Sequence, residues 1–299
     1  MMSDWIEATI RRHAVPLEPR ATGVPPRRSK PLALKGILFD IYGTLLVSAV
    51  GDIGSSEMPE AEAAEGALRS LDCEARGKGE LVATTLRRTI ERHHAEAKRR
   101  GIDYPEVAID RMWCEALDRL VDQGQLPAAA RQLDARRVSL EYEMRVNPVW
   151  PMPGLSEMLG RLRQLGLVLG IISNAQWFTR PIFETLTGKN LAYWGITDDL
   201  QIYSYRLGQA KPSAHLFQTA ETALSRRDVS PSQVLYLGND MRNDCWGAGR
   251  TGFQTALFAG DERSLRLRED DPLVQGYEPD WVITDLRELA EAVTATALR

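Results

Sequence analysis

An apolar run that ends in a single carboxylate stands early in the chain: Lys35-Gly36-Ile37-Leu38-Phe39-Asp40-Ile41-Tyr42-Gly43-Thr44-Leu45-Leu46. The segment Ile37–Phe39 is short, apolar and partly β-branched, which is typical of a strand buried on both faces of a parallel sheet. Asp40 then lies at the carboxyl end of that strand, where open α/β sheets form their ligand crevice. Since a carboxylate is costly to bury without a partner or a task, Asp40 is the first candidate for chemistry.

Three further polar groups follow later in the chain at comparable places. They are Ser173 and Asn174 after the apolar run 167–172, Lys211 before Pro212 at an expected helix start, and Asp240 and Asp244 after the run 234–237. Each has an ordinary structural explanation as a helix cap, a first-turn acid or a surface lysine. Their joint occurrence at the carboxyl ends of strands in one sheet favours a common site.

These residue types are suited to covalent catalysis. A carboxylate such as Asp40 can attack phosphorus or carbon and form a covalent intermediate. A lysine such as Lys211, together with a divalent metal, can neutralise the oxygens of a phosphoryl group. Carboxylates such as Asp240 and Asp244, completed by a backbone carbonyl and water, suit Mg²⁺. The pattern therefore predicts a nucleophile beside a cation, a small hydroxyl and a magnesium site.

The elements that must hold these residues alternate between strand and helix from residue 155 onwards. Besides residues 37–39 and 167–172, we expect strands at 201–205, 234–237, 254–258 and 281–283, and helices at 155–165, 181–186, 212–224, 245–251 and 286–293. This alternation predicts a doubly wound parallel sheet of the α/β class. Residues 59–146 carry four amphipathic helical patterns, which predict a helical bundle inserted after the first strand.

Charge, cysteine content and the length of the apolar runs indicate which partners and which cellular compartment to expect. The chain has 299 residues and a net charge of −4, so it has no global basic field for nucleic acid. Its three cysteines are odd in number and form no C-x-x-C pair, which fits a reducing compartment. No apolar run reaches the roughly 18 residues of a membrane span, and no secretory signal precedes residue 34. We therefore expect a cytoplasmic protein that binds neither membrane nor nucleic acid.

The order and spacing of these groups resemble the haloacid dehalogenase (HAD) superfamily. The resemblance covers residues 35–48 and about 150–290, and the helical insert is similar to the type 1 cap of that family. The motifs, in family order, are Asp40-Ile41-Tyr42-Gly43-Thr44-Leu45, Ser173-Asn174, Lys211-Pro212 and Gly238-Asn239-Asp240-x-x-x-Asp244. The resemblance implies a HAD-like Rossmannoid core with an inserted cap domain.

The resemblance also implies a role for each position. Asp40 would be the nucleophile, and Thr44 would support the loop that follows it. Ser173 and Asn174 would bind the transferring group, and Lys211 would hold Asp40 and the phosphoryl oxygens. The implied Mg²⁺ ligands are Asp40, the backbone carbonyl of Tyr42, Asp240 and Asp244. Trp177, which follows the second motif, is expected to wall the substrate site.

Two departures from the family pattern bear on the reaction. Family phosphatases carry a second aspartate two residues after the nucleophile, as the acid that protonates the leaving group. This chain has Tyr42 there, as do family members that resemble L-2-haloacid dehalogenases and need no metal. The second departure points the other way, because Asp240 and Asp244 keep an acid pair where the dehalogenase pattern, Ser-Ser-Asn-x-x-Asp, has few acids.

Three functions follow as predictions. The first is a Mg²⁺-dependent phosphatase that acts on a small phosphomonoester through an aspartyl-phosphate at Asp40. The second is a metal-independent hydrolase like the 2-haloacid dehalogenases, with an ester at Asp40. The third is a nearly inactive member that binds a partner through the cap or the arm. The protein is expected to be a monomer or a homodimer.

The predicted domain organisation has three parts. Residues 1–34 form an N-terminal helix (3–13) and a Pro/Arg-rich arm that is disordered or lies across the body or a partner. Residues 35–48 and 148–299 form the core, and residues 49–147 form the cap. The polar stretch 51–56 is a plain linker or a flap over the site.

Overall fold

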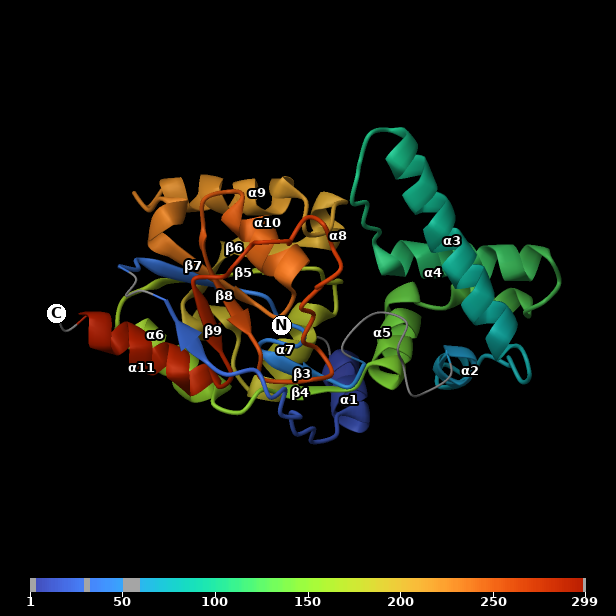
Figure 1. Ribbon diagram of the computed structural model, residues 1–299. Coiled ribbons are helices and arrows are strands. Elements are labelled where there is room, and N and C mark those ends of the chain that lie inside the picture. The colour runs from blue at the N-terminus through green and yellow to red at the C-terminus, as the bar shows by residue number, and fades with distance from the viewer. Residues whose placement is uncertain (1–3, 30–32, 51–59, 298–299) are drawn as a thin grey trace.

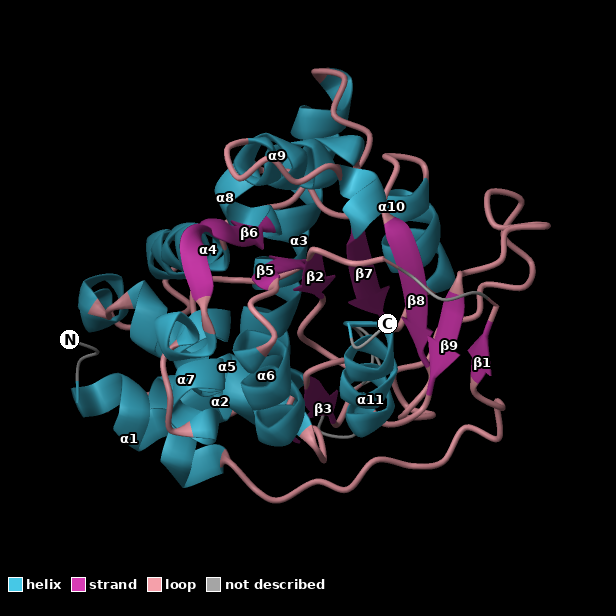
Figure 2. Ribbon diagram, turned by 90° about the vertical axis from the view of Figure 1, so that its left-hand side faces the viewer, coloured by secondary structure: helices cyan, strands magenta, loops and turns pink. Residues whose placement is uncertain are grey.

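The computed structural model of the chain describes residues 4–29, 33–50 and 60–297, and is organised around a central sheet. Its described strands run in the order β1-β9-β8-β7-β2-β5-β6, which Figure 2 shows from one edge to the other. They are β1 (Arg27–Arg28), β2 (Gly36–Phe39), β5 (Val168–Ser173), β6 (Ile196–Tyr203), β7 (Val234–Gly238), β8 (Gln254–Phe258) and β9 (Trp281–Ile283). All pairs are parallel except β1 with β9. The doubly wound parallel sheet predicted from the alternation is confirmed.

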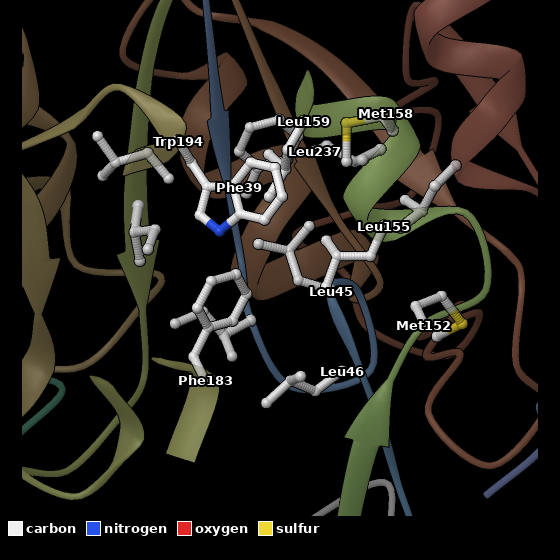
Figure 3. Packing of buried hydrophobic residues seen from close by; sticks show 14 of the residues in the cluster. Phe39, Leu45, Leu46, Met152, Leu155, Met158, Leu159, Phe183, Trp194 and Leu237 are labelled. Carbon is white, nitrogen blue, oxygen red and sulfur yellow. The ribbon is translucent and has the colours of Figure 1, made fainter. Parts of the chain in front are cut away.

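Helices cover both faces of this sheet, as Figure 1 shows. One layer contains α6 (Leu155–Gln164), α7 (Thr179–Thr187) and α11 (Leu286–Ala297), and the other contains α8 (Ser204–Leu207), α9 (Ala214–Ser225) and α10 (Gly247–Gly249). Strand β2 is buried on both faces, since Ile37 and Phe39 belong to one apolar cluster and Leu38 to the other. Figure 3 shows Phe39 packed among Leu159, Phe183, Trp194 and Leu237. This double burial explains the unbroken apolar run before Asp40.

The segment between β2 and β5 is mainly helical and lies beside the sheet in Figure 1. It contains β3 (Leu46–Ser48), α2 (Glu60–Arg69), α3 (Gly79–Arg99), α4 (Ile109–Asp122), the 3₁₀ turn η1 (Ala128–Gln132), α5 (Ala135–Val146) and β4 (Val149–Pro151). Helices α2 to α5 enclose an apolar cluster of their own, with Trp113 fully buried. The division of the chain into domains at residues 49 and 147 stays a prediction, and the stretch 51–56 lies outside the described residues.

Several boundaries differ from the sequence-based expectations for physical reasons. The sequence predicts that the third helix of this segment begins at Pro105, but α4 begins at Ile109, because Pro105 pairs with Gln209 in an extended bridge. Strand β6 begins at Ile196, five residues before the expected start. Its first half reads Ile-Thr-Asp-Asp, with exposed polar residues that lack an apolar pattern. Such edge segments are the hardest to recognise from sequence.

The N-terminal arm lies across the body of the protein in the described part of the chain. Helix α1 (Asp4–His13) packs on α5 and α7, and β1 pairs with β9 at the sheet edge. The carboxylate of Glu141 on α5 anchors α1, with Thr9 Oγ1 at 3.1 Å, Arg12 Nη1 at 3.2 Å and His13 Nε2 at 3.0 Å. The described part of the arm thus contacts the body of the protein through α1 and β1. No helix among the described residues has the length and apolar character to cross a membrane.

Substitution of Glu141 tests how α1 is held. Burial alone would raise the pKa of Glu141, but His13 and Arg145 outweigh it and lower the pKa from 4.5 to about 2. This carboxylate thus stabilises the fold above pH 4.5, and the contribution is lost as the pH falls from 4.5 towards 2. We expect Glu141→Gln to lower the free energy of unfolding at pH 7 by about 2–3 kcal/mol, measured in urea.

The matched control is Glu7→Gln on α1 itself, which removes an exposed pair with Arg11. It should change stability by less than about 0.5 kcal/mol. An equal loss of stability in both variants, or a Glu141→Gln effect that persists at pH 2, would contradict the assigned anchor.

Candidate active site

Asp40 lies at the centre of the carboxyl edge of the sheet. Strand β2 runs between β5 and β7, with Phe39 opposite Ile171 on one side and Leu237 on the other. The backbone N–H of Asp40 continues this pattern by donating to the carbonyl of Leu237 at 2.9 Å. Residues that follow these strands therefore meet at one place, as the sequence predicts.

The carboxylate of Asp40 is buried and held on one side only. Its Oδ1 accepts hydrogen bonds from Ser173 Oγ at 2.8 Å and from Lys211 Nζ at 2.7 Å. No donor among the described residues contacts Oδ2, and Asp40 lines a cavity. The fixed oxygen orients the group, and the second oxygen is left with lone pairs for attack, which is the arrangement required of a nucleophile.

Lys211 links Asp40 to the second acid of the fourth motif. Its ammonium group also contacts Asp244 Oδ1 and the hydroxyl of Tyr236 at 3.0 Å, and the residue is 5% exposed. Burial alone would lower the pKa of Lys211, but Asp244 and Asp40 outweigh it and raise the pKa. The lysine therefore stays charged, and it is positioned by Asn174, whose Oδ1 accepts from its backbone N–H at 2.7 Å.

The loop after Asp40 is fixed by a side chain that sequence analysis did not single out. Thr44 Oγ1 donates to Asn239 Oδ1 at 3.1 Å, and Asn239 Nδ2 donates to the carbonyl of Ser264. Gly43 has a φ of +78° and contacts Ser264 so closely that a side chain would not fit. Asn239, the first residue after β7, thus ties the first motif to the fourth, and its place directly after a strand was the available signal.

Asp240 and Asp244 have separate structural tasks. Asp240 caps the π-helical turn η4 (Met241–Trp246) by accepting from the N–H groups of Arg242 and Asn243. Its Oδ2 accepts from the guanidinium of Arg268, with Nη2 at 2.7 Å. Asp244 packs against Gly238, where a Cβ atom would lie 2.3 Å from the carboxyl carbon. Burial, with Asp40 and Asp240 nearby, raises the pKa of Asp244, and Lys211 opposes this.

The predicted magnesium ligands do not fit a Mg²⁺ site as the side chains are placed. No cluster of three or more His, Cys, Asp or Glu side chains in the described chain could hold a metal ion. Both oxygens of Asp240 already accept from protein donors, and so do both oxygens of Asp244. Among these donors are the side chains of two cations, Arg268 on Asp240 and Lys211 on Asp244. Arg268 lies in a loop with no sequence signal for this contact.

Tyr42 is not suited to replace the second aspartate of family phosphatases as the acid that protonates the leaving group. Its hydroxyl is hydrogen-bonded to Thr179 Oγ1 on α7 at 2.9 Å. Burial, with the charge of Glu143 as the next cause, raises the pKa of Tyr42 well above its ordinary value. A phenol with a raised pKa gives up its proton reluctantly, so Tyr42 is a poor acid for a leaving group.

Trp177 is placed differently from the expectation that it walls the site. Its ring packs against Trp5 of α1 and Phe178, and its indole N–H donates to Ser139 Oγ at 3.1 Å. It is not among the described residues that line the cavity, whereas its neighbours Gln176 and Phe178 are. The side chain of Trp177 therefore serves to dock α1 and α5 rather than to contact a substrate.

The cavity above Asp40 has a volume of about 490 Å³ and lies between the sheet edge and the helical segment. Its floor includes Asp40, Tyr42, Lys211 and Asn239 from the core. Its walls are largely apolar and come from α3, α4 and α5, with Ala83, Leu86, Ile90, Ile109 and Val146. A substrate that reaches Asp40 is thus enclosed by residues from both parts of the chain.

A family model for haloacid dehalogenase-like hydrolases matches residues 34–252. The chain belongs to this family. Its helical segment corresponds in place to the cap that the resemblance implies, and the protein is an enzyme of the hydrolase class. Asp40, Lys211 and Ser173 therefore lie together at the sheet edge of a HAD-like hydrolase.

Curated relatives carry two kinds of activity. A ribulose-1,5-bisphosphate 5-phosphatase from Halopiger xanaduensis is 29% identical over 145 residues, which cover 48% of this chain and 56% of that protein. A glyceraldehyde 3-phosphate phosphatase from Methanopyrus kandleri is 25% identical over 274 residues, covering 88% and 99%. An (S)-2-haloacid dehalogenase from Pseudomonas sp. strain YL is 26% identical over 270 residues, covering 88% and 96%.

A solved structure has the same fold. The 2-haloacid dehalogenase from Pseudomonas syringae pv. Tomato DC3000 superposes with a TM-score of 0.60 at 20% identity, covering 88% of this chain and 99% of that one. At this identity the likeness concerns the fold alone. Because phosphatases and a dehalogenase match to similar extents, similarity does not choose between the two reactions.

The contribution of Lys211, which lies between Asp40 and Asp244, can be tested by measuring the free energy of unfolding. Lys211→Met leaves Asp40 and Asp244 buried without their cation, so we expect a loss of about 3–5 kcal/mol in the free energy of unfolding. The double variant Lys211→Met/Asp244→Asn should lose less than the sum of the two single variants, because one of the buried charges is removed. Strict additivity in urea unfolding would contradict the coupling.

Proposed function

We propose that this protein is a metal-independent hydrolase that attacks carbon through Asp40, forms an ester there and releases halide from a 2-haloacid. The observation that carries the proposal is the pairing of both motif-four acids with cations of the chain. From the sequence, Asp240 and Asp244 favoured a phosphatase because two acids have little use without a metal. Arg268 on Asp240 and Lys211 on Asp244 supply that use.

The charges of the site support the same reaction. Three buried carboxylates, Asp40, Asp240 and Asp244, pair with two cations, Lys211 and Arg268, and Arg266 also lines the cavity. A phosphomonoester dianion would bring more negative charge to these carboxylates than a 2-haloacid does. A 2-haloacid brings a single negative charge, and its halide leaves without needing a proton.

The first step needs only groups that the chain provides. Oδ2 of Asp40 attacks the carbon that bears the halogen, the carbon–halogen bond breaks, and the halide departs with the bonding electron pair. Ser173 and Lys211 hold Oδ1 of Asp40 throughout, so the carboxylate cannot rotate away from the carbon. The resulting ester at Asp40 is then hydrolysed by water.

The shape of the cavity supports a substrate larger than the smallest haloacids. The walls formed by Leu86, Ile90 and Ile109 are apolar and face the polar floor around Asp40. A molecule with a carboxylate and halogen at one end and an aliphatic chain at the other matches this division. We therefore include 2-bromohexanoate beside 2-chloropropionate as a probe.

Halide release in the presence of a chelator tests the proposal. The wild-type protein should release halide from 2-bromohexanoate at the same rate with EDTA and with added Mg²⁺. Asp40→Asn should abolish turnover, because an amide oxygen is a poor nucleophile. The control Asp103→Asn alters an aspartate of the helical segment that does not line the cavity. Turnover that survives in Asp40→Asn would exclude the nucleophile assignment, and turnover that requires Mg²⁺ would exclude metal independence.

Heavy-oxygen water distinguishes an ester at Asp40 from an aspartyl-phosphate. Water attacks the carboxyl carbon of an ester, so a single turnover should place the label in the peptide that contains Asp40. An aspartyl-phosphate is attacked at phosphorus, and the label would then appear in phosphate. Mass spectrometry of the digested protein measures the first outcome, and label found in the hydroxy acid product would indicate direct attack by water.

A Mg²⁺-dependent phosphatase is the second candidate, and one observation favours it. Two of the curated relatives described above are phosphatases of small sugar phosphates, one of them matched over nearly its whole length. For this reaction Arg268 would have to leave Asp240. Phosphate release from a phosphomonoester panel, with Mg²⁺ and with EDTA, decides between the two candidates.

A further inference from the structure

One chemical task in the proposed reaction has no residue assigned to it. When water attacks the carboxyl carbon of the ester at Asp40, the water must give up a proton, and the ester oxygen that leaves with the product must receive one. Tyr42 is unsuited because its hydroxyl is held by Thr179 and its pKa is raised. An alkoxide is a poor leaving group without a proton donor, so the hydrolytic step needs an acid–base group in the cavity.

Glu143 on α5 is placed for this task. Its side chain lines the same cavity as Asp40 and Tyr42, on the wall that the helical segment contributes. Oε1 of Glu143 accepts from Asn147 Nδ2 at 3.2 Å, and Asn147 Oδ1 accepts from Ser48 Oγ at 2.7 Å. Ser48 belongs to β3, just after the first motif. The carboxyl group is thus tied through Asn147 to the strand that follows the nucleophile loop.

The second oxygen of Glu143 is available to a ligand. Oε2 has no hydrogen-bond partner within the described parts of the chain. The other glutamate of the cavity whose pKa is raised by desolvation, Glu106, differs in this respect. Its Oε1 accepts from the Val107 N–H and Gln176 Nε2, and its Oε2 accepts from Ser204 Oγ. Glu106 is a structural acceptor, whereas Glu143 presents an unpaired oxygen to the cavity.

The protonation of Glu143 suits a group that both takes and returns a proton. Burial raises the pKa of Glu143 to about 7, against a smaller opposing effect of the Asn147 hydrogen bond. Near neutral pH both forms are then populated, which is the condition for efficient proton transfer in either direction. The other titratable or charged side chains of the helical segment that line this cavity are Glu60, Arg87, Glu91, His94, Glu106 and Tyr142.

We propose that Glu143 is the acid–base residue that hydrolyses the covalent intermediate at Asp40, an inference that rests on the proposed function. The carboxylate of Glu143 takes a proton from water as the water oxygen bonds to the carboxyl carbon of Asp40. The bond from that carbon to the ester oxygen, which was Oδ2 of Asp40, then breaks, and this oxygen leaves with the substrate carbon, keeps the electron pair and receives the proton from Glu143. Asp40 is left as a carboxylic acid and returns its proton to solvent.

The test separates the two chemical steps with Glu143→Gln. Loss of the acid–base group should leave the first step intact and slow the second by about 10²–10⁴-fold. With 2-bromohexanoate the variant should release one equivalent of bromide per protein in a burst. The intact protein should then gain the mass of the substrate less its bromide, as measured by mass spectrometry. Glutamine keeps the acceptor for Asn147, and thermal melting checks that the variant is folded.

The matched control is Glu80→Gln on α3. Glu80 also accepts from a side chain four residues on, Thr84, but it is exposed and does not line the cavity. It should turn over like the wild type. Glu143→Asp, which restores a carboxyl group one methylene shorter, should recover part of the lost rate. Wild-type turnover in Glu143→Gln, or a folded variant without the burst, would overturn the assignment.

Failure of the proposed function would look different from failure of this inference. If the wild type releases phosphate from phosphomonoesters and no halide, the dehalogenase reaction is excluded. Glu143 is then tested as the acid for the alcohol that leaves phosphorus. Glu143→Gln should lose about 10²–10⁴-fold in rate on an alkyl phosphate and little on p-nitrophenyl phosphate, whose phenolate leaves without a proton. Equal losses on both esters would overturn the assignment.

Discussion

The ammonium group of Lys211, buried between Asp40 and Asp244, is the contact on which the rest of the site depends. Two carboxylates this close to each other and this far from water would repel, and burial alone would neutralise one of them. The ammonium group of the lysine contacts both carboxylates and fixes their positions relative to each other. Its own position is held by Asn174 through the backbone and by Tyr236 through the side chain. The site is therefore prepared before a substrate arrives, with one oxygen of Asp40 held and the other open.

A second ion pair involves the other acid of the fourth motif. Arg268 reaches Asp240 from a loop beyond β8, and Asp240 is one of the two acids that, in the sequence, suggested a metal site. Asp240 also caps η4, so both of its carboxylate oxygens accept hydrogen bonds from the protein. Both acids of the fourth motif thus have cationic partners within the chain, and this pairing is the basis of the proposed metal-independent reaction.

The helical segment completes the site from the other side. It supplies the apolar walls of the cavity and the carboxyl group of Glu143, while the core supplies the nucleophile and the cation. Helix α5, which carries Glu143, also carries Glu141, the residue that anchors α1. The N-terminal helix and the cavity wall are therefore parts of one packed unit, and displacement of α1 would act on the wall of the site through α5.

The sequence by itself determined the sheet, the family and the meeting of Asp40, Ser173 and Lys211. Side chains that follow neighbouring parallel strands must lie at the same edge of the sheet. Residues that come directly after these strands in the sequence are therefore close together in space. Only the tertiary structure decided where Asp240 and Trp177 point, that Asn239 ties two motifs together, and that Arg268 and Glu143 belong to the site. The direction of a side chain after a strand, and contacts from a distant loop or helix, depend on packing between segments. That packing cannot be predicted from the spacing of the motifs.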